Sequence, residues 1–164
     1  MDRNRRKVRD LLRRAGVHRP PVPVERIAEV LGLEVRHLPS PDEISGALIR
    51  KGKDLIIGVN SHQHPNRQRF TIAHEIAHFV LHKGRSLHVD EDFCINRDGS
   101  NNLDEMQANR FAAELLMPEG LVEADVSRFN VVDARIVGLL ASKYRVSSQA
   151  MQIRLSNLGY IAPF

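Results

Sequence analysis

The chain has 164 residues, a length typical of one domain with a substantial buried core. Its hydrophobic content of 42% and charged content of 27% are close to globular averages, which excludes a wholly disordered or fibrous protein. The net charge of +4 is concentrated before Pro20, where eight Arg and Lys residues are opposed by only two Asp residues.

Cysteine content and hydropathy predict a reduced protein of the cytoplasm. Cys94 is the only cysteine, so the chain forms no internal disulfide, and the segment Met1–Arg14 is dominated by Arg and Lys instead of an apolar leader. No window approaches the roughly 18 uninterrupted apolar residues of a membrane span. We therefore expect cytoplasmic localisation and no association with a membrane.

Two helices are predicted at the start of the chain. The first, within residues 1–19, ends at Gly16 and has an apolar side formed by Val8, Leu11, Leu12 and Ala15. Its basic side either faces solvent or binds nucleic acid or an acidic substrate. A proline-rich connector then leads to a second helix over residues 24–31, which Gly32 ends.

A small three-stranded antiparallel sheet is predicted next, because three short runs have strand character: residues 33–38, 44–50 and 55–60. Residues 51–54 contain Gly and Asp and are typical of a hairpin turn between the last two strands. Residues 65–82 then form a helix whose apolar residues point in almost every direction, which is typical of a buried helix.

The second half of the chain is predicted to be helical after a long polar loop over residues 85–102. A helix over residues 103–117 is stopped by Pro118, residues 118–125 restart as a short helical turn, and the last helices cover 132–143 and 147–158. The fold class is therefore α+β and mainly helical. We expect one domain, divided into a basic helix (1–19), a core (20–128) and a C-terminal helical subdomain (129–164).

The last two helices have the spacing of a helix-turn-helix, with Ser147 capping the second. Arg145 occupies the turn position where glycine is commonest. If the unit reads DNA, the side chains suited to base or phosphate contacts are Gln149, Gln152, Arg154 and Asn157. The alternative is that the pair packs against the core or docks a substrate, and nucleic acid is the less favoured partner.

The pattern H-E-x-x-H occurs at His74, Glu75 and His78, within the buried helix. Four residues are about one helical turn, so the two imidazoles share a face and suit one tetrahedral ion. Glu75 lies about 100° from His74 around the helix, so it flanks that face and can take a proton from a water activated by the ion. If the histidines were only core residues, burying these groups without an ion or partners would cost several kcal/mol.

A catalytic zinc site needs a third protein ligand and one open position. His82 is about 12 Å along the helix from His74, too far to share the ion, so it is expected to orient a ligand or face substrate. Glu105 and Glu114 compete for the third place and point in opposite directions from their helix. We favour Glu105, because Glu114 has an i−4 ion-pair partner in Arg110.

Asn109 and Cys94 are two further candidate residues. Asn109, one turn after Glu105, is placed to hydrogen-bond and orient a ligand. Cys94 has three open roles: a small buried hydrophobe, a redox-sensitive thiol, or an inhibitory fourth zinc ligand.

Zn²⁺ is the predicted cofactor, with Mn²⁺ as the alternative divalent cation. The oxyanion-stabilising group is open among His82, His88, Tyr144, Tyr160 and Arg69.

Two segments carry a resemblance to a known family. They read RFTIAHEIAHFVLH over residues 69–82 and E-x-x-A-N-x-F-A-A-E-L-L-M-P over residues 105–118. In this order they resemble the ImmA/IrrE family of bacterial zinc metallopeptidases, and weaker similarity extends from Val24 to the C-terminus. The resemblance implies a zincin-like domain with zinc bound by His74, His78 and Glu105 and with Glu75 as the catalytic base, which agrees with the helix-face argument.

The resemblance also implies a substrate, because members of this family cut helix-turn-helix repressors and thereby switch on stress-response or mobile-element genes. We therefore expect a hydrolase whose partner is such a repressor. The alternative is a non-catalytic zinc-containing regulator that binds DNA or a repressor through the C-terminal helix pair. The buried base Glu75 favours the enzyme, because a structural zinc site does not need one.

Overall fold

The computed structural model describes the backbone of residues 3–84, 87–91 and 100–163, and the side chains of residues 3–84 and 103–163. Seven helices and four strands lie in these ranges. The first half of the chain contains α1 (Arg3–Arg14), α2 (Val24–Val30), β1 (Glu34–Leu38), β2 (Ile44–Lys51), β3 (Asp54–Asn60) and α3 (Pro65–Leu81). The second half contains β4 (Leu87–Glu91), α4 (Ser100–Leu116), α5 (Glu119–Val126), α6 (Ala134–Tyr144) and α7 (Ser148–Asn157).

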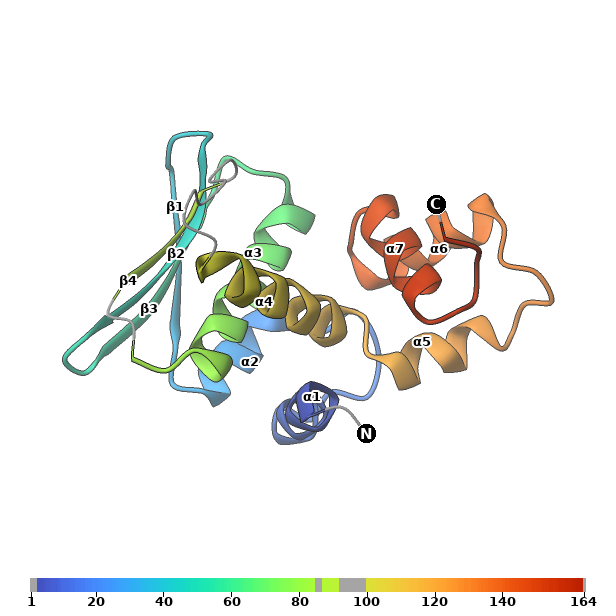
Figure 1. Ribbon diagram of the computed structural model, residues 1–164, viewed down its shortest axis with the longest axis horizontal. Helices are drawn as coiled ribbons and strands as arrows, with labels where there is room; N and C mark the ends of the chain where they lie inside the picture. Colours follow the sequence, from blue (N-terminus) through green and yellow to red (C-terminus); the bar gives the residue numbers. More distant parts are fainter. Residues whose placement is uncertain (1–2, 85–86, 92–99, 164) are drawn as a thin grey trace.

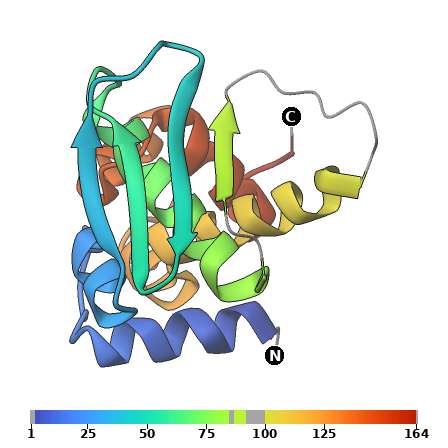
Figure 2. The same cartoon turned by 90° about the vertical axis from the view of Figure 1, so that its left-hand side faces the viewer.

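The arrangement confirms the predicted α+β class. The sheet lies at one side of the molecule and α5, α6 and α7 at the other, with α3 and α4 between them (Figure 1). The helices cover one face of the sheet, and α1 runs along one end of this helical layer (Figure 2). The predicted apolar side of α1 is buried, with Val8, Leu11 and Ala15 each at most 4% exposed. Within the described residues, no helix is long and apolar enough to cross a bilayer.

The sheet differs from the prediction in strand direction. Its order is β1-β3-β2-β4, and the predicted hairpin pairs β2 with β3 antiparallel around Gly52, whose φ is 60°. However, β1 pairs parallel with β3, so the expectation of a purely antiparallel sheet is wrong. The chain does reverse between β1 and β2, but β3 inserts between these two strands. β1 and β2, which follow one another in sequence, are therefore not neighbours in the sheet.

The sheet also has a fourth strand in the segment predicted as a loop. β4 pairs antiparallel with β2, with an irregularity of register between Ile44 and Gly46. Apolar Leu87 and Val89 alternate with polar residues, which is a strand signal, but the surrounding polar residues obscured it. The following helix also begins before the predicted residue 103, at Ser100. Cys94 lies outside the described residues.

Close packing positions α3 between the sheet and α4. A Cβ atom built on Gly46 of β2 would lie 2.4 Å from Thr71 Cγ2 and 2.7 Å from the Gly58 carbonyl oxygen, so only glycine allows α3 to approach the strand this closely. On the other side α3 packs against α4. Small, fully buried residues lie on both helices: Ala73, Ala77, Ala108 and Ala112.

The C-terminal helix pair forms as predicted, with α6 and α7 separated by a short turn. The Ser147 side chain accepts a hydrogen bond from the Ala150 backbone N–H at 3.0 Å, which confirms it as the cap of α7. Arg145 adopts the left-handed conformation (φ 52°) that usually selects glycine at this position. Asp125 joins α5 to α6, because its carboxylate binds Lys143 at 2.6 Å and the Tyr144 hydroxyl at 2.9 Å.

Candidate metal centre

The H-E-x-x-H residues lie in the most buried part of α3. The helix begins after His64, whose Nδ1 accepts a hydrogen bond from the Asn66 backbone N–H, and Pro65 occupies its first turn. His74 and His78 are each 2% exposed and Glu75 is fully buried. Three ionisable side chains in an apolar layer need compensating partners or an ion.

The two imidazoles converge with a carboxylate from α4. His74 Nε2 and His78 Nε2 are 3.0 Å apart. Glu105 lies against both, with Oε2 3.1 Å from His74 Nε2 and Oε1 3.3 Å from His78 Nε2. This is a group of ligand atoms from two helices that could hold one metal ion.

The separations fit a tetrahedral ion. Zinc with bonds of about 2.0–2.1 Å needs its ligand atoms about 3.3–3.4 Å apart, close to the separations within this group. Two imidazole nitrogens and one carboxylate oxygen are also a ligand set typical of catalytic zinc, in which three protein ligands leave one position open. The residues present therefore fit a catalytic divalent cation.

Hydrogen bonds from neighbouring side chains orient both imidazoles. Asn109 Oδ1 lies 2.9 Å from His74 Nδ1, and because an amide oxygen only accepts, the imidazole donates from Nδ1 and directs the lone pair of Nε2 at the centre. His82 Nδ1 lies 3.1 Å from His78 Nδ1. On its far side, His82 Nε2 is 3.3 Å from Asp104 Oδ1 and 3.3 Å from Gln107 Oε1. Asn109 and His82 thus each contact the Nδ1 nitrogen of a candidate ligand, while the Nε2 nitrogens of both ligands face Glu105.

The end of α3 is held by a residue that the sequence did not reveal. The Arg50 guanidinium, from β2, donates to the carbonyl oxygens of His78 (3.3 Å), Phe79 (3.3 Å) and His82 (3.1 Å). It also lies over the Phe79 ring, 4.9 Å from the ring centre. Burial lowers the pKa of Arg50. One cation in a strand carries no signal that it will cap a distant helix, so only the fold reveals this contact.

Glu114, the competing candidate for the third ligand, lies away from the centre. Its carboxylate forms a buried ion pair with Arg154 of α7, and Arg154 Nε also donates to the Met117 carbonyl oxygen at 3.0 Å. The expected pairing of Glu114 with Arg110 is therefore wrong. Glu114 pairs with Arg154 of the distant helix α7 instead of with Arg110, one turn earlier on α4.

The remaining candidates for oxyanion stabilisation are mostly engaged elsewhere. Arg69 donates to the carbonyl oxygens of Val22 (2.9 Å) and Arg145 (3.3 Å). The Tyr144 hydroxyl binds Asp125, and burial followed by this hydrogen bond raises the pKa of Tyr144. Burial and the charges of Glu123 and Glu119 raise the pKa of Tyr160.

The two remaining candidates for oxyanion stabilisation are His82 and His88. His82 lies at the metal-binding group, against His78. The side chain of His88 is outside the described side chains.

The helix-turn-helix-like pair does not present all the side chains expected to contact DNA. Arg154 is 8% exposed and is engaged by Glu114 and the Met117 carbonyl. It is therefore unavailable for a base or a phosphate. Gln149 and Asn157 are exposed, and Gln152 is half-buried.

Comparison with known sequences gives a consistent family. A family model described as the IrrE N-terminal-like domain matches residues 28–156. A protein of Deinococcus radiodurans described as "Radiation response metalloprotease IrrE" is 34% identical over 95 residues, covering 58% of this chain and 29% of its own length. A Deinococcus deserti protein of the same description is 37% identical over 93 residues, covering 57% of this chain and 33% of its own. The chain spans about a third of the length of these curated relatives.

Comparison with solved structures supports the fold. A structure described as a Mycobacterium tuberculosis transcriptional regulator matches with a TM-score of 0.67 and 15% sequence identity. The match covers 95% of this chain and 47% of that chain. At this identity the likeness concerns the architecture alone.

Proposed function

This chain belongs to the IrrE N-terminal-like family, and from that premise we propose that it is a zinc-dependent endopeptidase that cleaves a helix-turn-helix transcriptional repressor. One observation carries the proposal: ligand atoms of two buried imidazoles and of a carboxylate from a second helix lie within 4.8 Å of one another, and Glu75, next to His74 in the chain, is fully buried. The fit of these atoms to a tetrahedral ion supports His74, His78 and Glu105 as the ligands.

Glu75 is the proposed general base. A zinc ion bound there supplies Lewis acidity, which lowers the pKa of water toward neutrality and polarises a peptide carbonyl. The Glu75 carboxylate takes the proton from the attacking water and returns it to the nitrogen of the leaving amine. Its position about 100° around α3 from His74 supports this role, because a carboxylate there flanks the ligand face without competing for it.

Asn109 and His82 are the proposed positioning residues. Asn109 accepts a hydrogen bond from His74 Nδ1. His82 Nδ1 contacts His78 Nδ1, the ring nitrogen that is not the proposed ligand atom. Such contacts fix the ring orientation and raise the basicity of the nitrogen that binds the ion. Asp104 and Gln107 support His82 in turn, so the ligand geometry is maintained by α4 as well as by α3.

The substrate is proposed from the family. Two relatives are described as radiation response metalloproteases, which supports a protein substrate, and the ImmA/IrrE resemblance supports a repressor. Cleavage would relieve repression of stress-response or mobile-element genes. A transcriptional repressor as substrate also places the reaction in the cytoplasm.

The test is zinc-dependent cleavage of a helix-turn-helix repressor from the same genome, the first choice being one encoded by an adjacent gene. Purified protein is incubated with that repressor, with and without a chelator, and fragments are identified by intact mass. We expect defined fragments only without chelator, and restored cleavage after zinc is added back. Intact repressor under every condition, with zinc stoichiometrically bound, would contradict the enzymatic proposal and favour a regulatory role without catalysis.

Variants separate the proposed roles. Glu75→Gln is expected to abolish cleavage with zinc content unchanged, because it removes the base but no ligand. Glu105→Ala is expected to lower zinc content itself. Glu123→Gln, an exposed carboxylate of α5, is the matched control and should change neither quantity. Cleavage by Glu75→Gln at the normal rate would refute the base, and full zinc occupancy in Glu105→Ala would refute the third ligand.

A further inference from the structure

A groove of about 960 Å³ runs along α4, between α1 and α7. Figure 1 shows α4 in the middle of the molecule, with α1 below it and α7 to its right. The volume is at the upper end of the range for small-molecule pockets, so the groove can accept a chain segment. No residue of this groove is used by the proposed catalytic step itself.

One end of the groove adjoins the metal-binding group. Among its lining residues, Asn109 hydrogen-bonds His74, and the Phe70 ring stacks on the His74 ring with centroids 6.1 Å apart. Gln107, also in the lining, contacts His82. The other end reaches Asn157 and Leu158 at the end of α7. A segment lying in the groove therefore has one end beside the candidate active site.

The lining combines apolar side chains with unneutralised positive charge. Ala150, Ile153 and Leu158 contribute apolar surface, and Ile153 is 47% exposed. Arg5 pairs with Glu119, and Arg154 with Glu114, so these charges cancel.

Three cations of the lining remain: Arg3, Lys7 and Arg110. Within the described part of the chain none of the three forms an ion pair. Burial and the charges of Arg3 and Lys83 lower the pKa of Lys7.

We propose that this groove docks an acidic segment of the substrate protein that carries large apolar side chains, and so delivers the adjoining chain to the metal centre. Carboxylates would complement the three unpaired cations, and apolar side chains would cover Ile153 and its neighbours. Nucleic acid fits less well, because bases bound in a groove stack on aromatic rings and Phe70 is the only aromatic residue in the described lining. This inference rests on the proposed endopeptidase function.

The binding test uses two fluorescein-labelled peptides of equal length with identical leucine positions, one with Glu and one with Lys at the polar positions. Fluorescence anisotropy is measured with the Glu75→Gln protein, so that no probe is cut. We expect the acidic peptide to bind at least about tenfold more tightly than the basic one, and the preference to shrink as salt is raised. Equal affinities, no binding below about 1 mM, or displacement of the acidic peptide by equimolar duplex DNA would overturn the proposal.

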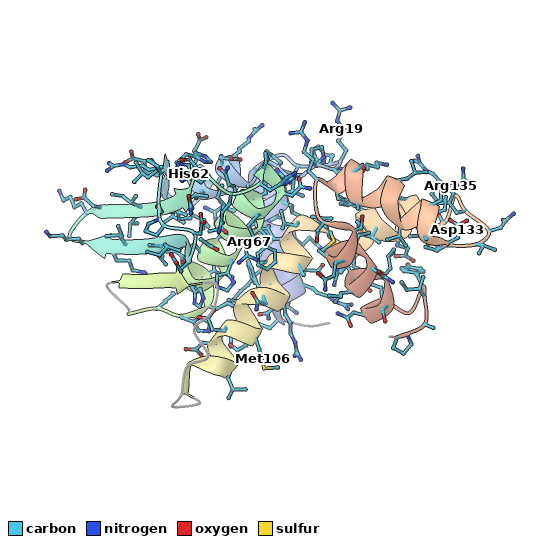
Figure 3. All side chains as sticks on the ribbon, turned by 90° about the horizontal axis from the view of Figure 1, so that it is seen from above. Arg19, His62, Arg67, Met106, Asp133 and Arg135 are labelled. Atoms are coloured by element: carbon cyan, nitrogen blue, oxygen red, sulfur yellow. The ribbon has the colours of Figure 1, made fainter. Side chains whose placement is uncertain are left out.

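Charge reversal locates the site. Arg110→Glu and Lys7→Glu are each expected to weaken acidic-peptide binding at least about fivefold, with zinc content and the circular dichroism spectrum unchanged. Arg135→Glu is the matched control, because Arg135 is exposed, does not line the groove, and lies at the end of the molecule farthest from the sheet, well apart from Met106 of α4 (Figure 3). Unchanged binding in Arg110→Glu and Lys7→Glu, or an equal loss in Arg135→Glu, would overturn the assignment.

Cleavage kinetics distinguish failure of the docking site from failure of the enzyme. On the repressor, Arg110→Glu should raise KM at least about fivefold and leave kcat unchanged, since the residue contacts neither the ion nor the base. An unchanged KM with normal cleavage would refute docking while the endopeptidase stands. Peptide binding that behaves as expected in a protein that cuts no repressor would refute the endopeptidase and leave the groove as a binding site.

Discussion

The buried pair between Arg154 and Glu114 offers the sharpest stability prediction. Each residue is 8% exposed, and Arg154 also donates to the Met117 carbonyl oxygen. Arg154→Met retains most of the aliphatic volume but leaves Glu114 as an uncompensated buried charge. Removing one partner of such a pair costs about 3–5 kcal/mol. For a domain of this size, 1 kcal/mol corresponds to about 2–4 °C, so the melting temperature should fall by roughly 6–20 °C.

The assay is thermal and urea unfolding of the zinc-loaded protein, followed by circular dichroism. The exposed pair between Arg5 and Glu119 provides the control, because Arg5→Met removes the same type of contact at the surface and should cost less than about 1 kcal/mol. The double variant Arg154→Met, Glu114→Gln should be more stable than Arg154→Met alone, because no buried charge is left unpaired. Equal losses in Arg154→Met and Arg5→Met would refute the reasoning.

Three further predictions follow from contacts around α3. Asn109→Ala should weaken zinc binding about 10–100-fold by releasing His74, measured by competition with a chelator of known affinity; an unchanged affinity would contradict the positioning role. Gly46→Ala should lower the free energy of unfolding by about 1–3 kcal/mol, because its Cβ would overlap Thr71, and urea unfolding with a normal midpoint would be evidence against that close packing. Arg50→Leu should fray the end of the zinc helix, seen as faster hydrogen exchange of its last-turn amides; protection equal to that of the unmodified protein would argue against capping by Arg50.

Local sequence was sufficient for the helices, for three of the four described strands and for the two histidines of the candidate site. The spacing of His74 and His78 places them on one helix face whatever surrounds them, because helical periodicity is a property of the local backbone. The ends of α1 and α2 follow from glycines that adopt positive φ, at Gly16 and Gly32. The α+β class and the family were also predictable, because each strand, each helix and each of the two long motifs is a single run of consecutive residues.

Contacts between distant segments were decided by the fold alone. The partner of Glu114, the parallel pairing of β1 and the capping of α3 by Arg50 each join residues far apart in the chain. In each case the sequence offered a nearer partner or none, and burial selected the distant one. Helix periodicity settles which way a side chain points, but only packing settles what it meets there, because the packed arrangement minimises the free energy of the whole chain and not that of its separate segments.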